Sequence, residues 1–531
     1  MIRVNNIHLS LDYDDKSVRK AVAQQLRIEE KSIKSCKIFR RSVDARKKDS
    51  IYFLTTVDAE LNINEDKVCK KCGNAQIAKK YEYNQMKFGN APSPVVVGAG
   101  PAGLFAALIL ARSGANPILI ERGRDVDRRT ADVNRFWTSG QLDTTSNVQF
   151  GEGGAGTFSD GKLNSGTKDI RQRKVLEEFV SHGAPDEILY NAKPHIGTDM
   201  LKGTIKNIRN EIIELGGRVK FETKLVSMAF SDNKLKSITV ETANGNEIIE
   251  TDNVILAIGH SARDTFEMLY DLKLPIEAKP FSVGARIEHL REKIDKAQYG
   301  RFAGNKKLGS ANYKLSTHLD NGRGVYTFCM CPGGKVVNAS SEENRLCTNG
   351  MSEFARDAEN SNSALLVGIN PDDYESDHPL AGMYLQRRLE SKVFVAGGEN
   401  YNAPIQRVDD FLNNKKSTHL GDVKPSIGPN YEFSNLNEIL PEYISTSMAQ
   451  GIVKMGRMLH GFDDGDAVLT GVESRSSSPV RIMRKTDTLE SILIEGLYPC
   501  GEGAGYAGGI ISAAVDGIKC AEKIIEKSNK N

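Results

Sequence analysis

The feature that most constrains this chain is a glycine-rich turn between an apolar strand and an apolar helix. The turn directly follows Val95–Val97 and opens an apolar stretch over residues 102–113. In such a unit the first glycine allows the tight turn, the second lets a pyrophosphate approach the backbone, and the third lets helix and strand pack closely. The residues of the turn are Gly98, Ala99, Gly100, Pro101, Ala102 and Gly103. They predict a dinucleotide whose phosphates lie at the helix N-terminus.

The end of the next apolar strand narrows the choice of dinucleotide. This strand, over residues 117–121, ends at Glu121, followed by Arg122. An acid at this position accepts hydrogen bonds from the 2′- and 3′-hydroxyls of a ribose and disfavours a 2′-phosphate. The nucleotide is therefore predicted to be FAD or NAD rather than NADP, with both residues in its site. A glycine-rich turn without a ligand is disfavoured, because the strand–turn–helix–strand context is complete.

Two segments far along the chain favour FAD over NAD. Residues 253–260 form an apolar strand that ends in Ala257 and Gly259, where the chain is expected to pass the nucleotide. Near the C-terminus, Gly501 and Glu502 follow another strand, and an acid after a glycine there can bond the ribityl hydroxyls.

A second helix start follows this C-terminal strand. Its residues are Gly508, Gly509 and Ile510. The N–H groups of this helix are expected to face O2 and N1 of a flavin, where the helix dipole favours the anionic reduced form. Since NAD alone would not need this third element, the predicted cofactor is FAD.

The order of the segments predicts the domain organisation. A chain of 531 residues suggests about three domains. The strand and helix patterns of residues 1–88 predict a small α+β module of the ferredoxin-like type. Those of residues 92–270 predict the first part of a Rossmann-like FAD/NAD(P)-binding domain. Residues 271–490 do not continue the α/β alternation and form a candidate inserted mixed α/β substrate domain. Residues 491–531 then complete the nucleotide domain. The predicted fold class is therefore α/β.

Composition excludes several classes of protein. Hydrophobic residues make up 39% and charged residues 26%, which is globular usage, and the net charge of +2 gives no overall attraction to nucleic acid or anionic membrane. The longest apolar run is broken by glycine and proline and is too short for a membrane span. Eight cysteines need no disulfide framework, and no secretory signal is apparent, so the cytoplasm is the expected compartment. A basic stretch at residues 31–48 is read as a solvated face rather than a docking surface.

Beyond the nucleotide motifs, several stretches resemble a known family. They are residues 150–163, 281–288, 329–334, 349–352 and 501–505. On these stretches the chain resembles FAD proteins of the glutathione-reductase superfamily. It is more closely similar to a bacterial family of largely uncharacterised FAD-dependent dehydrogenases.

This resemblance implies a single FAD domain with a separate substrate domain. It also implies that the loop carrying Gly153, Gly154 and Lys162 lies by the pyrophosphate and flavin ring, and that Val226 touches the adenine region. The superfamily usually has Asp where this chain has Glu502.

The sequence marks candidate catalytic residues less clearly. Cys329 and Cys331 form a C-x-C pair, for which packing or substrate lining is favoured over a redox role. A zinc site at Cys69 and Cys72 is disfavoured because no second ligand pair lies nearby, so no metal is expected. Arg286 and Lys162 could hold an anionic substrate or the flavin; the alternative for each is a structural ion pair. His195, Glu288 and Asn349 are further polar groups of the family-like stretches.

The sequence therefore predicts an FAD-dependent oxidoreductase that transfers a hydride through flavin N5 to or from a small molecule. No second dinucleotide fingerprint is found, so a nicotinamide donor would bind only transiently. One alternative is a flavin-dependent monooxygenase or oxidase. The other is a non-catalytic or RNA-associated flavoprotein that uses the basic stretch at residues 31–48, which the near-zero net charge disfavours.

Overall fold

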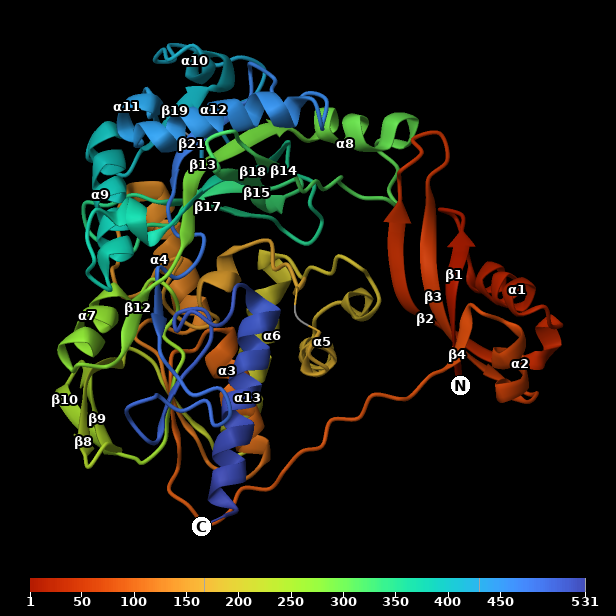
Figure 1. Cartoon of the computed structure of the whole chain (residues 1–531), viewed down its shortest axis with the longest axis horizontal. Helices are drawn as coiled ribbons and strands as arrows, with labels where there is room; N and C mark the ends of the chain where they lie inside the picture. The colour runs from red at the N-terminus through yellow and green to blue at the C-terminus, as the bar shows by residue number, and fades with distance from the viewer. Residues whose placement is uncertain (167, 429, 531) are drawn as a thin grey trace.

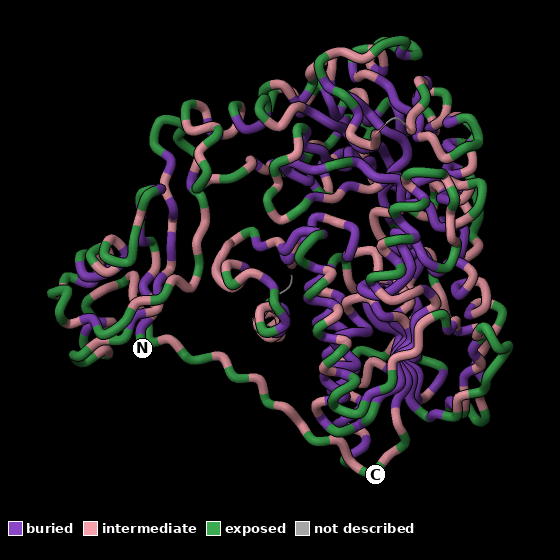
Figure 2. Tube along the Cα trace, turned by 180° about the vertical axis from the view of Figure 1, so that it is seen from behind, coloured by how far each residue is buried: buried purple, intermediate pink, exposed green. Residues whose placement is uncertain are grey.

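The computed structural model describes residues 1–166, 168–428 and 430–530. It shows a small N-terminal module beside a larger body built on two sheets, with a long extended linker between module and body (Figure 1). Figure 2 shows buried residues concentrated along the two sheets of the body, whereas the linker over residues 78–94 is mostly exposed or half-buried. We find no helix among the described residues with the length and apolar character that a bilayer span requires.

The N-terminal module has the predicted ferredoxin-like topology. Its antiparallel sheet has the order β2-β3-β1-β4, with two helices packed on one face. Alternating apolar residues of the strands face these helices, which explains the period-two pattern. The elements are β1 (Ile2–Leu9), α1 (Asp15–Leu26), β2 (Ile33–Asp44), β3 (Tyr52–Leu61), α2 (Glu65–Lys71) and β4 (Ala75–Ile77).

The nucleotide domain is built on a five-stranded parallel sheet of order β23-β11-β5-β6-β7. The strands are β5 (Val95–Val97), β6 (Ile118–Ile120), β7 (Arg218–Lys220), β11 (Val254–Leu256) and β23 (Leu497–Pro499). The last strand lies beside β11 although more than 240 positions separate them (497 − 256 = 241). The fold class is thereby confirmed: a Rossmann-like domain that is completed by the C-terminal part of the chain. The exact domain boundaries stay predictions.

Opposite faces of this sheet pack against different layers. Val96 belongs to the core shared with the helices, whereas Val95 and Val97 belong to the core shared with a three-stranded antiparallel sheet. The helices of the domain are α3 (Pro101–Arg112), α4 (Val126–Ser139), α5 (Arg171–Ser181), α6 (Thr198–Glu214), α7 (Arg263–Asp271) and α13 (Ile510–Ser528). The three-stranded sheet consists of β8 (Lys224–Ser231), β9 (Lys234–Thr242) and β10 (Gly245–Glu250).

Helices α3 and α13 lie side by side and bring the two halves of the domain together. A Cβ on Gly517 of α13 would lie 2.0 Å from the backbone oxygen of Ala102, so the close approach requires a glycine. Because these are the helices that open after the two glycine-rich turns, their N-termini are brought to the same side of the sheet (Figure 1).

The inserted domain is built on a seven-stranded sheet of order β14-β15-β18-β13-β21-β19-β20. Its strands are β13 (Phe281–Leu290), β14 (Ser316–His318), β15 (Gly324–Cys331), β18 (Asn360–Ile369), β19 (Ala403–Arg407), β20 (Tyr431–Phe433) and β21 (Val468–Glu473). Its helices are α8 (Arg291–Tyr299), α9 (Ala381–Ala396), α10 (Val408–Leu412), α11 (Leu436–Ile439) and α12 (Glu442–Gly456). All pairs are antiparallel except β19–β20.

Two short ladders complete the inserted domain. The strands β12 (Ile276–Ala278) and β22 (Val480–Ile482) pair where the chain leaves and re-enters the nucleotide domain. The strands β16 (Lys335–Asn338) and β17 (Thr348–Met351) form the second ladder. The inserted domain thus covers the carboxyl ends of the parallel strands.

Candidate cofactor and substrate site

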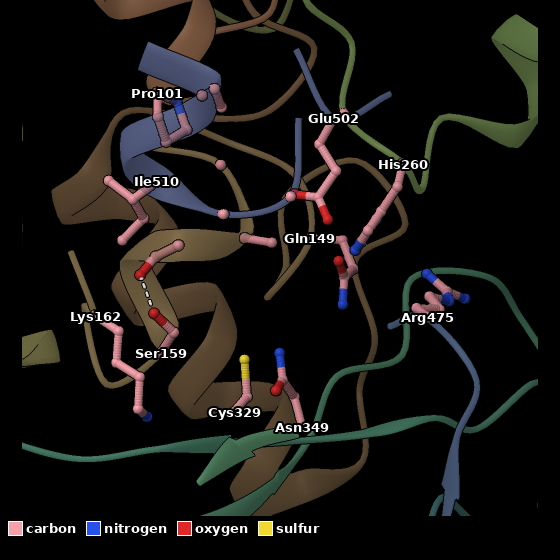
Figure 3. Close-up of a pocket in the computed structure, with 18 of the residues that line it drawn as sticks. Pro101, Gln149, Ser159, Lys162, His260, Cys329, Asn349, Arg475, Glu502 and Ile510 are labelled. Carbon is pink, nitrogen blue, oxygen red and sulfur yellow. Dashed lines mark hydrogen bonds between the residues drawn. The ribbon is translucent and has the colours of Figure 1, made fainter. Parts of the chain in front are cut away.

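A cavity of about 610 Å³ lies between the parallel sheet and the seven-stranded sheet (Figure 3). Its walls include Val97, Ile120, Ala257 and Cys500, which lie at or just after the carboxyl ends of four parallel strands. Open α/β sheets bind nucleotides at this edge. The opposite wall comes from the inserted domain, so one cavity joins a nucleotide end to a cap end.

The glycines of the first turn divide into those that the fold needs and one that faces the cavity. Gly98 has φ +99°, and a Cβ on Gly103 would lie 1.8 Å from the backbone oxygen of Gly98. A Cβ on Gly100 would meet nothing nearer than the Cα of Gly154, at 3.8 Å, and both glycines line the cavity. Gly98 and Gly103 therefore serve the turn and the packing, while Gly100 leaves space for a ligand.

The N-termini of α3 and α13 both open on this cavity. Their N-cap residues, Gly100 and Gly509, make no side-chain capping hydrogen bond, so backbone N–H groups stay available. Gly508 and Gly509 line the cavity, and a Cβ at either would meet nothing within 4 Å. This cradle fits FAD, because one helix start can receive the pyrophosphate and the other the flavin.

Glu121 lies where the sequence predicts, at the end of β6, and it lines the cavity. Its carboxylate accepts hydrogen bonds from the backbone N–H groups of Ala99 at 2.8 Å, Gly123 at 2.9 Å and Gly151 at 3.0 Å. It therefore ties the fingerprint turn to the loop after Phe150. Its contact with a ribose stays a prediction.

Arg129 of α4 is a buried residue that holds this loop and that the sequence did not reveal. Its guanidinium donates to the backbone oxygens of Asn147 at 2.8 Å, Val148 at 3.0 Å and Glu152 at 2.6 Å. Burial lowers its pKa to about 10 against the opposing effect of Glu121 and Glu152, so it stays charged at neutral pH. Arg129 thus holds the backbone of residues 147–152, which lead directly into Gly154.

Glu502 points into the cavity from the turn after β23 (Figure 3). Burial raises the pKa of its carboxyl to about 7, against the opposing effects of Lys279 and the backbone N–H of Gly509. The departure from the usual Asp therefore leaves an acid at the cavity wall that titrates near neutrality. Its contact with the ribityl chain stays a prediction.

The cap end of the cavity carries Cys329 and a charged cluster. Cys329 has φ +41° at an irregularity of β15, and its thiol points into the cavity (Figure 3). Although Cys329 is open to the cavity, desolvation by the surrounding protein raises the pKa of this thiol to about 11, so it is protonated at neutral pH. Cys331 is also a free thiol; its sulfur lies 4.0 Å from Nζ of Lys162. Lys162 in turn pairs with Asp160 at 2.9 Å.

Arg286 has the structural role that the sequence left as the alternative. It is fully buried beneath the cavity wall, where its Nε lies 2.9 Å from Oε2 of Glu473. It also donates to Oδ1 of Asn349 at 2.8 Å and to the backbone oxygen of Cys329 at 2.9 Å. It therefore orients two residues of the wall, and it is not itself among the residues that line the cavity.

The other polar groups of the family-like stretches are also held internally. Glu288 is fully buried and accepts hydrogen bonds from Ser426 and Asn360. The ring of His195 stacks on Phe354, and its Nε2 lies 3.0 Å from the backbone oxygen of that residue. Burial, followed by the charge of Arg356, lowers the pKa of His195 to about 4, so the ring is neutral at neutral pH.

A second buried charge network reaches the cavity through Arg475. Glu390 of α9 is fully buried between Arg475 and Arg263, with closest distances of 2.7 Å to each. His260, which lines the cavity nearby, has its pKa lowered to about 3 by burial and by these arginines. Arg475 thus lines the cavity with its charge matched by Glu390.

Most of the predicted site residues line the cavity. They are Gly98, Gly100, Pro101, Ala102, Glu121, Arg122, Gly154, Lys162, Ala257, Gly259, Glu502, Gly508, Gly509 and Ile510. The remaining predicted residues are not among those that line it: Ala99, Gly103, Gly153, Val226 and Gly501. Val226 lies at an irregularity of β8, and its neighbours Thr223 and Leu225 line the cavity instead.

The sequence did not reveal four further cations of the cavity wall. These are Lys193, Lys314, Arg356 and Arg475. Each lies on a different segment, and no local motif surrounds it. Only long-range contacts of the folded chain bring them together.

Comparisons with known proteins agree with this geometry. Residues 280–476 match a family model described as FAD-dependent protein, C-terminal domain-like, and residues 93–132 match an FAD binding domain. Residues 1–60 match a domain of unknown function. A protein of Clostridium beijerinckii, described only as uncharacterised, is 50% identical over 532 residues, with 99% of each chain covered. The chain belongs to this family of FAD-dependent proteins. Its cofactor is FAD.

Solved structures with a related arrangement are distant. The chain is similar to a halogenase in complex with FAD at 10% identity and a TM-score of 0.40, covering 84% of this chain and 71% of that one. It is similar to a flavoprotein/dehydrogenase from Cytophaga hutchinsonii at 14% identity and a TM-score of 0.35, covering 83% and 79%. At these values neither structure carries an argument about the reaction. The expected place within the glutathione-reductase superfamily is not confirmed.

Proposed function

We propose that this protein is an FAD-dependent oxidoreductase that acts on a small organic molecule bound at the cap end of the cavity. The observation that carries the proposal is that one continuous cavity has a glycine-lined nucleotide end and a wall of polar side chains from another domain. Bound FAD would supply hydride transfer at N5, and the protein supplies position and electrostatics.

At the nucleotide end, the backbone would do most of the binding. The start of α3 at Gly100 and Pro101 would hold the pyrophosphate, and the start of α13 at Gly509 and Ile510 would face the flavin. Glu502 would bond the ribityl hydroxyls from the turn after β23. A nicotinamide donor, if one is used, would bind transiently at the cap end.

At the cap end, two neutral hydrogen-bond donors face the cavity. Oδ1 of Asn349 accepts from Arg286, which turns the Nδ2 group of the amide toward the cavity (Figure 3). The protonated thiol of Cys329 lies beside it (Figure 3). These two groups would hold an oxygen atom of the substrate, and Cys329 is placed to move a proton there.

The test is anaerobic reduction of the purified yellow protein in a stopped-flow instrument. NADH, NADPH and a metabolite panel are mixed with it, and bleaching of the flavin absorbance is followed. We expect at least one reductant to bleach the flavin, with saturation at high concentration. A protein that purifies without flavin and takes none up would contradict the proposal.

The same experiment separates the oxygen-dependent alternative. When oxygen is admitted, an oxidase or monooxygenase would reoxidise its flavin rapidly and yield hydrogen peroxide or an oxygenated product. A dehydrogenase or reductase would reoxidise slowly and would pass its electrons to an added organic acceptor instead.

A further inference from the structure

The cap end of the cavity has an excess of positive charge. Four cations line it, Lys162, Lys193, Lys314 and Arg356, against one carboxylate, that of Asp160. The difference is four positive charges less one negative, or +3. This count leaves out two charged groups of the wall that buried partners already match: Glu473 is matched by Arg286 and Arg475 by Glu390. A cleft lined by charges of one sign concentrates ions of the opposite sign near its walls.

Asp160 is the one carboxylate of this cluster, and its negative charge is already balanced by cations of the cluster. It pairs with Lys162 at 2.9 Å and accepts from Nε of Arg356 at 2.8 Å. Burial opposes ionisation of Asp160, but these two cations outweigh it and hold the pKa of this carboxyl well below its usual range. Asp160 fixes the two cations in place and still leaves one positive charge over.

Lys193 and Lys314 add two charges that nothing in the described chain balances. Neither forms an ion pair with any residue in 1–166, 168–428 or 430–530, and Lys193 donates only to the side-chain oxygen of Asn312. Both lysines line the cavity but are themselves exposed; partial desolvation, followed by the charge of Arg356, lowers the pKa of Lys193, and no carboxylate opposes this. A bound anion would relieve that unfavourable arrangement.

The uncharged groups beside the cluster are donors too. The amide Nδ2 group of Asn349 and the protonated thiol of Cys329 face the same space as Lys162 (Figure 3). A wall that offers N–H and S–H groups and positive charge suits oxygen atoms that accept several hydrogen bonds at once.

We propose that the substrate of this site is a small organic anion whose carboxylate or phosphate group is held by Lys162, Lys193 and Lys314. This rests on the proposed oxidoreductase function and names the class of molecule on which it acts. The anionic group binds at the lysines, and Asn349 and Cys329 face the part of the substrate nearer the flavin.

The test is a binding titration of the purified FAD-loaded protein, followed by the change in its visible flavin spectrum. The probes are benzoate, inorganic phosphate and benzamide, at constant ionic strength. Benzamide has the shape of benzoate but no charge. We expect benzoate or phosphate to bind with at least about tenfold higher affinity than benzamide, which corresponds to one well-placed charge interaction. Higher affinity for benzoate would indicate a carboxylate site, and higher affinity for phosphate would indicate a phosphate site.

Variants locate the binding at the three lysines. Lys162→Gln is expected to weaken binding of the preferred anion by about tenfold or more, and Lys193→Gln or Lys314→Gln by about three- to tenfold each. The matched control is Lys306→Gln, an exposed lysine in the loop before β14 that does not line the cavity. Retained flavin absorbance shows that each variant is folded and loaded.

Failure of this inference can be told from failure of the proposed function. Equal binding of benzoate and benzamide, no spectral response to either anion, or lysine variants that match the control would each overturn the anion site. Efficient bleaching of the flavin by a neutral substrate would do so too, while leaving the oxidoreductase in place. Anion binding to a flavin that no reductant bleaches would leave the site in place and remove the function.

Discussion

The two ends of the cavity are built in different ways. The nucleotide end is made mainly of backbone, with glycines at Gly100, Gly154 and Gly508 and the starts of two helices. The cap end is made of charged and polar side chains from several distant segments, fixed by ion pairs such as Lys162 with Asp160. A backbone site fails when volume is added to it, whereas a side-chain site fails when charge is removed from it. The predictions below use this difference.

The largest expected effect is at the nucleotide end, for Gly100→Val. Gly100 has φ −75°, which valine tolerates, and the nearest atom to an added Cβ is 3.8 Å away. The fold should therefore survive, while the side chain occupies the space needed by the pyrophosphate. We expect FAD affinity to fall by about 100-fold or more, measured by the flavin content of the purified protein and by titration with FAD.

The control for this variant is Gly203→Val, which adds the same side chain on the open surface of α6. It should purify with its full flavin content. If Gly100→Val keeps its flavin, the start of α3 is not where the pyrophosphate binds.

The next effect concerns charge at the cap end, for Glu390→Gln. Glu390 is fully buried between Arg263 and Arg475, and Glu342 is the second carboxylate of this network, paired with Arg263 and 3.9 Å from Arg475. The neutral amide therefore leaves two guanidinium groups with one carboxylate instead of two. Breaking a buried pair in this way costs about 3–5 kcal/mol of stability. Chemical denaturation should show a large loss for this variant and almost none for Glu343→Gln, an exposed neighbour in sequence of the network residue Glu342. Equal stability of the two variants would show that the network is not a stabilising device.

The two ends also differ in how visible they are in the sequence. The nucleotide end could be predicted because the tight turns and the close approach of a ligand both favour glycines, and these glycines lie near one another in sequence, as at Gly98, Gly100 and Gly103 and in the Gly508–Gly509 pair. The ferredoxin-like module and the return of the chain at β23 followed from strand and helix periodicity. These features are local, so their residues lie next to one another in the sequence.

The cap end could not be predicted in the same way. Lys193, Lys314 and Arg356 come from three separate segments: Lys193 reaches Lys162 within the nucleotide domain, whereas Lys314 and Arg356 are brought there by the inserted domain. Arg286 is a case that the sequence left open: it allowed either an anionic ligand or a structural ion pair, and burial against Glu473 makes the side chain a support for the wall. Spacing in sequence carries no information about either case.

A smaller effect, which depends on pH, is expected at Glu502. The folded pKa of about 7 lies above the ordinary value of 4.5, so the folded state prefers the protonated acid. The stability from this preference is fully present below about pH 4.5 and is lost as the pH rises through about 7. Glu502→Gln has no such loss, so its advantage over the natural protein should grow from about pH 5 to about pH 8, to at most about 3 kcal/mol.

The measurement for Glu502→Gln is the melting temperature of the flavin-free protein at the two pH values. We expect the variant to melt at the same temperature as the natural protein, or lower, in acid and several degrees higher in mild alkali. A difference that does not change with pH would show that Glu502 does not titrate in this range.

The smallest expected effect is on anion binding and comes from Arg41, a residue of the N-terminal module that contacts the segment before Lys193. The backbone of Arg41 pairs with Tyr190 at 2.7 Å and Ala192 at 2.8 Å, and its side chain donates to Asn191 at 2.8 Å. This segment continues directly into Lys193, so the module steadies a lysine of the anion site. Arg41→Ala removes only the side-chain bonds, each worth about 1 kcal/mol, and the backbone pairs stay.

We therefore expect Arg41→Ala to weaken benzoate or phosphate binding by only about two- to fivefold, because one side-chain anchor of several is lost. The control is Arg40→Ala, an exposed neighbour on β2. In the double variant with Lys193→Gln, the effect of Arg41→Ala should disappear, because the lysine that it steadies is gone. An effect that persists in the double variant would mean that the module acts on the site by another route.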